Sequence, residues 1–250
     1  MKTRNIIPEQ KGEFTKVLEE FYVYTGDLND KYVQRSCKDL GFWDKTLTEW
    51  MIKNIKPGWV CLDIGSNNGY FTDIMSRLSG PSVEVCAFEP IKHLYVKHLE
   101  SISINDYKDC SPIILKNVAL SNIDSDGYIR IRIENIGSSE IVDVAQEKPG
   151  QYYSEKIQLV RLENIIDKKI DFIKIDVEGH ERFVLEGFGK LCKECPLIVI
   201  ELGSHQPDEF IIELQKRYNM NFLNGIVATL DKIKKHEVID VVMLKKDTND

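Results

Sequence analysis

Short apolar runs alternate with longer segments of helical spacing over most of this chain. The strand-like runs lie near residues 59–64, 83–88, 113–118, 170–176 and 196–202. The helical patterns lie near residues 69–78, 91–102, 179–190 and 207–218. Strands that are apolar along nearly their whole length, separated by helices, are typical of a parallel sheet with both faces covered. The pattern therefore predicts an α/β fold with a mostly parallel sheet and helices on both faces.

The N-terminal part of the chain shows a different pattern. Residues 14–21 and 43–51 each place apolar side chains at helical spacing, and Pro57 ends the second pattern. We therefore expect residues 1–57 to form an N-terminal helical extension and residues 58–250 to form one domain.

Two segments in the middle of the chain interrupt the alternation. Residues 128–133 alternate polar and apolar side chains at period two, and residues 157–162 do so in part, which predicts an inserted pair of strands. Residues 134–156 between them form a polar stretch that we expect to be either a lid or a surface excursion. Near the C-terminus, residues 221–245 are expected to form a final strand pair.

Composition and charge narrow the class of protein. The chain has 250 residues, 42% of them hydrophobic, and a formal net charge of -7. It can therefore bury a full core, and a broad basic surface for nucleic acid is not expected. The apolar runs are far shorter than the ~20 residues of a membrane span, and residues 1–20 contain no signal-peptide core, so we expect a cytoplasmic protein. Cys192 and Cys195 lack a second pair at zinc-like spacing, which predicts a structural role for them.

Residues 60–72 carry the most specific motif. A short apolar run ends in Asp63, a glycine-rich bend follows from Gly65 to Gly69, and helical spacing begins after it. This layout is typical of a nucleotide-type cofactor site. Asn67 stands where a dinucleotide fingerprint has glycine for close approach to a pyrophosphate. The bend therefore favours S-adenosylmethionine, which has no phosphate, over NAD. A glycine-rich turn without a chemical role is the alternative.

A second acid stands at the end of the next apolar run. Glu89 follows residues 83–88, and Pro90 fixes the turn out of the run. An acid in this place can accept hydrogen bonds from both hydroxyls of a ribose. Together with Asp63, Glu89 therefore matches a cofactor that has an amino-acid part and a ribose, whereas a solvated glutamate at a strand end is the alternative.

A third motif follows the apolar run at residues 170–176. Asp176, Glu178, His180 and Glu181 lie within a few residues of its end. Ligands of open α/β sheets bind at the carboxyl ends of the strands, and crowded carboxyl groups there have raised pKa values. We therefore expect Asp176 and Glu178 to face the reacting centre, with His180 as a further candidate. The alternative is a helix start whose acids favour the helix dipole.

Taken together, these motifs resemble the FkbM family of S-adenosylmethionine-dependent methyltransferases. The matching stretches are residues 62–69, 87–90, 117–121, 137–139, 173–181, 184–187 and 199–201. The resemblance implies a class I methyltransferase (Rossmann-like) fold, which has a mostly parallel seven-stranded sheet with one antiparallel strand. It also implies an enzyme that uses S-adenosylmethionine to methylate a hydroxyl on a sugar, a polyketide or another small acceptor.

The resemblance also implies roles for residues at matching positions. The implied donor-binding residues are Asp63, Gly65, Ser66, Asn67 and Gly69 around the methionine part, Glu89 at the ribose, and Val118 and Ala119 near the adenine. Asp176 and Glu178 would lie near the methyl group and the acceptor. Ser66 stands where the family usually has alanine, and His180 stands where a small residue is common.

The expected chemistry is transfer of a methyl group to an acceptor oxygen. A sugar hydroxyl is a poor nucleophile at neutral pH, so a base must take its proton. Asp176 is the first candidate for this base, and Glu178 would orient the acceptor. His180 is an alternative base, as is His205, which follows the apolar run that ends near Glu201. No metal site is expected, although two neighbouring carboxylates could bind magnesium.

Other functions stay open at this point. An N-methyltransferase acting on an amine or a protein side chain would have the same fold. A nucleic-acid 2′-O-methyltransferase usually needs a basic groove, which the net charge of -7 disfavours. A catalytically silent donor-binding partner subunit could have lost Asp63, Glu89 or Asp176, and this chain keeps all three. An NAD-dependent oxidoreductase is the least supported.

Overall fold

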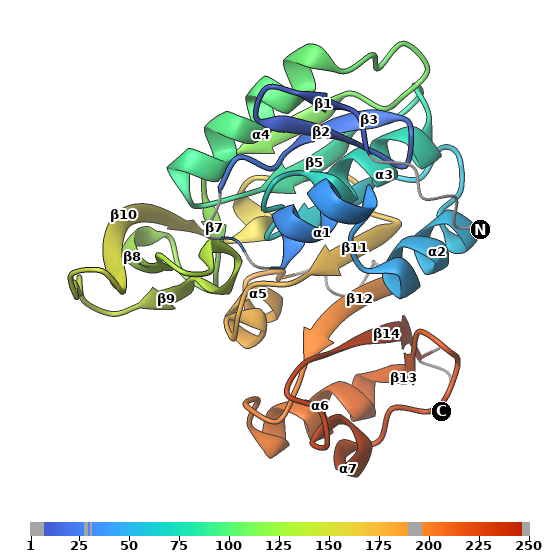
Figure 1. Cartoon of the computed structure of the whole chain (residues 1–250). Helices are drawn as coiled ribbons and strands as arrows, with labels where there is room; N and C mark the ends of the chain where they lie inside the picture. The colour runs from blue at the N-terminus through green and yellow to red at the C-terminus, as the bar shows by residue number, and fades with distance from the viewer. Residues whose placement is uncertain (1–7, 28–29, 31, 190–196, 247–250) are drawn as a thin grey trace.

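The computed structural model describes residues 8–27, 30, 32–189 and 197–246. Within these residues a seven-stranded sheet, in the order β13-β14-β12-β11-β4-β5-β6, forms the centre of the molecule (Figure 1). Its strands are β4 (Cys61–Ile64), β5 (Val85–Phe88), β6 (Ile113–Lys116), β11 (Phe172–Ile175), β12 (Leu197–Leu202), β13 (Tyr218–Phe222) and β14 (Ile239–Lys245). Neighbouring strands from β6 to β12 pair in parallel, and β14 is antiparallel to both β12 and β13. The predicted mostly parallel sheet and the final strand pair are therefore confirmed.

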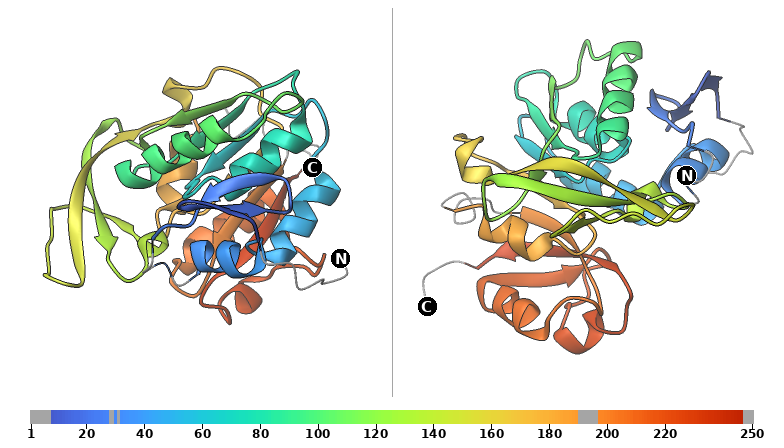
Figure 2. Two further views of the ribbon diagram at one scale, coloured as in Figure 1. Left: turned by 45° about the horizontal axis from the view of Figure 1, so that its top comes forward. Right: turned by 90° about the vertical axis from the view of Figure 1, so that its left-hand side faces the viewer.

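Helices cover both faces of this sheet, as the apolar pattern predicts (Figure 2). The helices are α1 (Val33–Leu40), α2 (Lys45–Asn54), α3 (Tyr70–Ser79), α4 (Lys92–Ile104), α5 (Glu181–Glu186), α6 (Asp208–Arg217) and α7 (Leu230–Ile233). Val85, Phe172 and Val199 lie in one core cluster with apolar residues of α2 and α3. Ile173 and Ile198 lie in the cluster of the opposite face, with apolar residues of α5 and α6. Because successive side chains of a strand point to opposite faces, residues two apart share a face.

A second sheet projects from the side of this body (Figures 1 and 2). Its described strands are β7 (Ala119–Leu120), β8 (Ser125–Arg132), β9 (Glu140–Val142) and β10 (Tyr152–Val160), in the order β7-β10-β8-β9. The long antiparallel pairing of β8 with β10 confirms the predicted inserted strand pair. The stretch between them contains β9 and a short 3₁₀ turn, η1 (Ile136–Ser138), and Ile136 packs with Ile91 and Leu94 at the start of α4.

The predicted helix over residues 14–21 is wrong, so the N-terminal extension is not wholly helical. This region forms a small antiparallel sheet of β1 (Gln10–Lys11), β2 (Phe14–Val17) and β3 (Phe21–Tyr24). Leu18 and Glu19 have positive φ values of 52° and 59°, which a helix cannot contain and a tight turn uses. Val17 pairs with Phe21 across this turn. The second predicted helix is present as α2.

The N-terminal sheet is attached to the elements that build the site. The backbone N–H of Tyr22 donates to Asn105 Oδ1 at 2.6 Å, and Asn105 Nδ2 donates back to the Tyr22 carbonyl at 2.8 Å. Asn68 Nδ2, in the glycine-rich bend, donates to the carbonyl of Tyr24 at 3.0 Å. These bonds fix the N-terminal segment against α4 and against the bend before α3.

The described cysteines and helices bear on the predictions of a core role and of no membrane span. Cys61 and Cys86 are buried free thiols in the central strands, as expected for small core residues. Cys192 and Cys195 lie outside the described residues. No described helix is both long and apolar enough to cross a membrane.

Candidate active site

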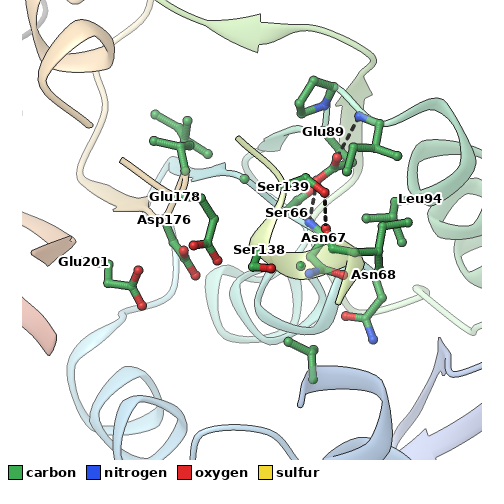
Figure 3. A pocket seen from close by; sticks show the side chains of 18 of the residues that line it. Ser66, Asn67, Asn68, Glu89, Leu94, Ser138, Ser139, Asp176, Glu178 and Glu201 are labelled. Atoms are coloured by element: carbon green, nitrogen blue, oxygen red, sulfur yellow. Dashed lines mark hydrogen bonds between the residues drawn. The ribbon is translucent and has the colours of Figure 1, made fainter. Parts of the chain in front are cut away.

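A cavity of about 410 Å³ opens where β4, β5, β11 and β12 end. This volume lies within the range of ligand pockets, roughly 300–1,000 Å³. Figure 3 shows polar side chains gathered at its two ends. We call the part around Ser66, Asn67 and Glu89 the glycine-bend end. We call the part around Asp176, Glu178 and Glu201 the carboxylate end.

The bend between β4 and α3 has backbone angles that few residue types adopt. Gly65, Asn67 and Gly69 have positive φ values of 80°, 51° and 89°. A Cβ atom on Gly65 would lie 1.9 Å from the carbonyl oxygen of Asp176, so glycine is required where this bend crosses the end of β11. The N–H groups of Gly65 and Ser66 both donate to the carbonyl of Phe88 at 3.0 Å. The bend is therefore fixed to both neighbouring strands.

Glu89 lies in the cavity wall immediately after β5 and is 4% exposed. Its Oε2 accepts the N–H of Asn67 at 2.9 Å, and its Oε1 accepts the N–H of Ile91 at 2.8 Å. Burial raises the pKa of Glu89 to about 8, although both backbone bonds favour the charged form. Each carboxylate oxygen keeps a second acceptor site, which two hydroxyl groups of a ribose could use.

Three buried polar atoms around the bend have no hydrogen-bond partner among the described residues. They are the Oγ of Ser66, the Oδ1 of Asn67 and the Oδ1 of Asp63. Buried polar groups in proteins are rarely left unpaired, so a bound polar molecule is a physical reason for such atoms. Ser66 and Asn67 line the cavity, whereas Asp63 lies behind its wall. The glycine-bend end therefore fits a ligand with several polar groups.

Asp63 does not line the cavity, but Lys174 connects it to Asp176, which does. It is fully buried, its Oδ2 accepts a hydrogen bond from Thr72 Oγ1 at 2.6 Å, and burial raises its pKa. Lys174, its partner across the β4–β11 ladder, places Nζ 3.9 Å from Asp63 Oδ1 and 3.1 Å from Asp176 Oδ2. Burial opposes the charge of Lys174, but the carboxylates of Asp176 and Asp63 outweigh burial and raise the pKa of Lys174. This lysine holds the Asp176 carboxylate at the cavity wall.

Sequence reasoning assigned no role to Lys174, although the sequence contained a signal. Lys174 is the charged residue inside an otherwise apolar strand, and its side chain is 3% exposed. A buried lysine needs an acidic partner, and alternation on β11 places it on the same face as Asp176. The sequence does not show that β11 pairs with β4, and this pairing makes Asp63 a second acidic partner of Lys174.

The carboxylate end brings together acids from separate strands. Asp176 follows β11, Glu178 has a φ of 52° in the next turn, and Glu201 lies on β12. Burial and the nearby Asp176 raise the pKa of Glu178 to about 8 and that of Glu201 to about 10. Residue Glu178 is exposed at the rim, while its carboxyl group lies beside Asp176 (Figure 3). No cluster suited to a metal ion occurs in the part of the chain that the structure describes.

Several predicted site residues lie away from the cavity. His180 Nε2 is 3.0 Å from Ser121 Oγ, its ring packs on Phe183, and burial lowers its pKa to about 4. Gly69 faces His98, whose Nε2 would lie 2.3 Å from an added Cβ. His205 lies 3.4 Å from the carbonyl of Glu237. None of these three predicted residues lines the described cavity, in contrast to Gly65, Val118 and Ala119, which do.

Glu181 follows the alternative interpretation of its motif. Its Oε1 accepts the N–H groups of Val177 at 3.2 Å and of Gly179 at 3.1 Å at the start of α5. Its other carboxyl oxygen accepts a hydrogen bond from Gln206. Glu181 therefore stabilises the turn that carries Glu178 instead of facing the cavity.

Parts of the wall come from segments that have no recognisable motif. Tyr32, Val33 and Trp43 line the cavity from the N-terminal segment, and Glu237 and Val238 line it from the loop before β14. Sequence reasoning missed these residues because only the folded chain brings the two segments to the same edge of the sheet.

Comparisons with known proteins agree with this geometry. The model of the methyltransferase FkbM domain family matches residues 63–236. A candidate rRNA methylase from Clostridium thermocellum has a similar fold, with a TM-score of 0.50, 11% identity, and coverage of 80% of this chain and 94% of that protein.

Two further solved structures are similar to this chain. Methyltransferase FkbM from Methylobacillus flagellatus has 15% identity and a TM-score of 0.47 over 75% of this chain, and the match spans 43% of that protein. A TehB-like S-adenosylmethionine-dependent methyltransferase from Corynebacterium glutamicum has 10% identity and a TM-score of 0.49, with coverage of 85% and 94%. No curated protein sequence matches this chain significantly.

Proposed function

This chain belongs to the FkbM methyltransferase family, and we propose that it methylates a hydroxyl group on a sugar or a similar small acceptor. Its methyl donor is S-adenosylmethionine. When bound, the donor supplies a methyl group on a positively charged sulfur, which is already activated for transfer. The tasks left to this chain are to bind and orient both partners and to accept the proton of the acceptor hydroxyl.

The glycine-bend end fits the donor. Glu89 has free acceptor sites for ribose hydroxyls, and Val118 and Ala119 supply an apolar wall next to it. The unpartnered Ser66 and Asn67 oxygens are available to the polar groups of the methionine part. Asp63 would act behind the wall through Lys174, and Gly69 would act by packing on His98, so neither is proposed as a direct contact.

Asp176 is the proposed general base, and its contact with Lys174 is the observation that carries this proposal. Lys174 Nζ holds Asp176 Oδ2 at 3.1 Å, which leaves Oδ1 to accept the hydroxyl proton of the acceptor. A lysine in this position orients the carboxylate toward the cavity. Glu178, on the adjacent turn, would hydrogen-bond another hydroxyl of the acceptor. His180 and His205 are not proposed as bases, because neither lines the cavity.

A nucleic-acid acceptor is disfavoured, although one structural neighbour is a candidate rRNA methylase. Phosphate backbones are bound by lysine and arginine clusters. The cavity is lined by Asp176, Glu178, Glu201 and Glu237, and the chain has a net charge of -7. Lys174 is the cation among the described lining residues and is paired with Asp176, so the cavity offers no basic groove for a phosphate backbone.

The donor site is tested by calorimetric titration with S-adenosylmethionine and, separately, with NADH. We expect binding of the first only, and about tenfold to hundredfold weaker binding in Glu89→Gln. Hydrogen bonds donated by the ribose would favour the charged form of Glu89, and hydrogen bonds to a charged acceptor contribute about 1.5–3 kcal/mol. Glu84→Gln is the matched control, since Glu84 precedes the same strand at its opposite end and pairs with Lys168 on the surface. Equal affinities in both variants would remove Glu89 from the donor site.

The base is tested by a screen of sugars for donor-dependent mass gain, followed by kinetics of Asp176→Asn. We expect a loss of about 10²–10⁴-fold in kcat with donor affinity nearly unchanged, because the variant removes proton transfer and leaves the glycine bend intact. Unchanged turnover in a folded variant would show that another group takes the proton.

A further inference from the structure

We infer that the acceptor carries a positively charged amino group, which the carboxylate end of the cavity receives. This inference rests on the proposed function, because it assigns the acceptor class of that same site. The acceptor class is a hydroxylated ring that bears a protonated amine. The hydroxyl would face Asp176, and the ammonium group would lie toward Glu201 and Glu237.

The first observation is an excess of acid at this end. Asp176, Glu178, Glu201 and Glu237 line the cavity, and Lys174 is the cation among the described lining residues. Lys174 is already paired with Asp176 at 3.1 Å and lies 3.9 Å from Asp63. It also favours the charged forms of Glu178 and Glu201, but burial and the neighbouring acids outweigh this effect.

Other cations near these acids are also paired. Arg132 lies close enough to Glu178 to favour its charged form, but Arg132 Nη2 bonds Glu140 at 2.6 Å. Burial and repulsion raise the pKa of Glu201 to about 10, so its protonated form is favoured near neutral pH. An ammonium group bound there would take the place of that proton and compensate the carboxylate charge.

The cavity contains more acidic residues than the positive charge of the donor's sulfur would require. In Figure 3 Glu201 lies beyond Asp176 and Glu178, on the side of the cavity away from Glu89. With its ribose at Glu89 and its methyl group near Asp176, as proposed above, the donor would place the charge of its sulfur close to Asp176 and Glu178. Glu201 and Glu237 therefore remain for the other substrate.

The second observation is an aromatic wall at the same end. Trp43 and Tyr32 line the cavity. Trp43 adjoins Asp44, which hydrogen-bonds Asp240, and Asp240 pairs with Glu201 across the β12–β14 ladder. This chain of contacts brings the segment that carries Trp43 close to the carboxylate end, and Trp43 itself lines the cavity. Aromatic faces beside carboxylates favour ammonium groups and also stack on sugar rings.

The third observation concerns where these walls come from. Tyr32, Trp43 and Glu237 lie outside the segment that matches the family, residues 63–236. The wall of the carboxylate end therefore combines side chains that lie outside the family segment with acids that lie inside it, Asp176, Glu178 and Glu201. At the glycine-bend end of the same cavity, the Ser66 hydroxyl is 4% exposed and has no partner among the described residues, which is a separate sign that this cavity takes polar ligands.

The test uses the full chain saturated with S-adenosylhomocysteine and ligand-observed NMR titration with matched pairs of probes. The pairs are D-glucosamine against N-acetyl-D-glucosamine, and cyclohexylamine against cyclohexanol. We expect each amine to bind at least tenfold more tightly than its neutral partner. Glu201→Gln should reduce this preference at least fivefold, and Glu209→Gln, which changes an exposed acid on α6, should not. Trp43→Leu should weaken all ring probes.

The outcomes separate this inference from the proposed function. If S-adenosylhomocysteine binds and no amine exceeds its neutral partner, the charged-acceptor inference is overturned and the donor site stands. If the preference exists but survives in both Glu201→Gln and a second variant, Glu237→Gln, the assignment to the carboxylate end is overturned. Failure of S-adenosylhomocysteine to bind would overturn the proposed function and this inference with it.

Discussion

The two ends of the cavity are built in different ways. At the glycine-bend end, the consecutive residues from Gly65 to Asn68 all line the cavity, and Glu89 is bonded directly to the N–H of Asn67. At the carboxylate end, Glu201 comes from a separate strand, and Trp43 comes from the N-terminal segment. One end is thus centred on a contiguous motif, and the polar groups of the other come from separate segments.

The difference also appears in how each end satisfies its polar groups. Burial raises the pKa of the acids at both ends, but both oxygens of Glu89 accept backbone N–H groups. At the carboxylate end, repulsion between neighbouring acids adds to burial and raises the pKa values of Glu178 and Glu201. A binding site for one shared donor can be fully formed in advance. A site that collects mutually repelling acids is stabilised by the ligand that neutralises them. This contrast suggests that donor affinity is set locally and acceptor preference is set by the assembly of distant segments.

The largest expected effect comes from Gly65→Ala, at the point where the two ends touch. An added Cβ would lie 1.9 Å from the Asp176 carbonyl oxygen, at a φ of 80°. We expect a loss of about 4 kcal/mol in the free energy of unfolding, because backbone overlap adds to the cost of a left-handed alanine. Urea unfolding measures this loss.

The matched control for Gly65→Ala is Gly150→Ala. Gly150 has a similar φ of 73°, with nothing within 4 Å of its added Cβ. It should lose only about 1–2 kcal/mol, the cost of the backbone angle alone. Equal losses in the two variants would mean that the contact between the bend and β11 is not what requires glycine at position 65.

The next effect comes from Lys174→Met, which removes the cation between the ends. Asp63 and Asp176 would lose their common partner. We expect a loss of about 3 kcal/mol at pH 7, since breaking a buried ion pair leaves its partner uncompensated. Lys168→Met, which removes a surface pair with Glu84, should lose at most about 1 kcal/mol. A loss no larger than that of the control would show that Lys174 does not hold this network together.

The contrast between the ends also explains what could be predicted from the sequence. The strands and most helices of the central domain were predictable because burial on both faces gives apolar runs. Gly65, Asn67 and Glu89 were predictable as a group because one motif and the next strand end bring them together. The helix predicted at residues 14–21 failed because the turn at Leu18 and Glu19 is decided by pairing of β2 with β3, which spacing alone does not reveal.

The carboxylate end was predictable only in part. Asp176 and Glu178 were expected at the edge because they follow a strand. Lys174 was missed because its partners lie across a strand ladder, and Trp43 was missed because a single aromatic residue carries no signal of what it will contact. His180 has a reactive side chain in a promising motif, yet its ring turns to Ser121. Side-chain direction after a strand end depends on packing that the sequence does not state.

A smaller effect is expected in Glu201→Gln, which should change how the free energy of unfolding depends on pH. Its pKa in the folded chain is raised to about 10, above its ordinary value near 4.5. Between these values the folded state holds a proton that the unfolded state has lost, so stability falls as pH rises through this window. Glu201→Gln should reduce the downward slope between pH 6 and pH 8 by about 1 kcal/mol per pH unit.

The measurement is urea unfolding of both proteins at several pH values without ligands. Glu209→Gln serves as the control, because Glu209 is exposed at the start of α6 and should leave the slope unchanged. If the free energy of unfolding falls with pH equally steeply in the wild type and in Glu201→Gln, the pKa of Glu201 is not raised in the folded chain. The two ends would then not differ by repulsion among their acids.

The smallest expected effects come from Ser66→Ala at the glycine-bend end, which should raise stability and lower donor affinity. Ser66 Oγ is buried without a partner, so Ser66→Ala should stabilise the unliganded chain by up to about 1 kcal/mol. The same change should weaken binding of S-adenosylmethionine by about fivefold, because the hydroxyl finds its partner in the bound donor. Unfolding and calorimetric titration of one variant measure both effects.

Ser139→Ala is the matched control for Ser66→Ala. Ser139 lines the same cavity and is 7% exposed, but its Oγ already donates to the Ile136 carbonyl at 2.7 Å. Its loss should destabilise the chain by about 1 kcal/mol and leave donor affinity nearly unchanged. Two buried serines in one wall would then change stability in opposite directions, and only the unpartnered one would affect the donor. If Ser66→Ala instead destabilises the chain as Ser139→Ala does, its hydroxyl already has a partner in the unliganded protein, and the argument that it awaits the donor fails.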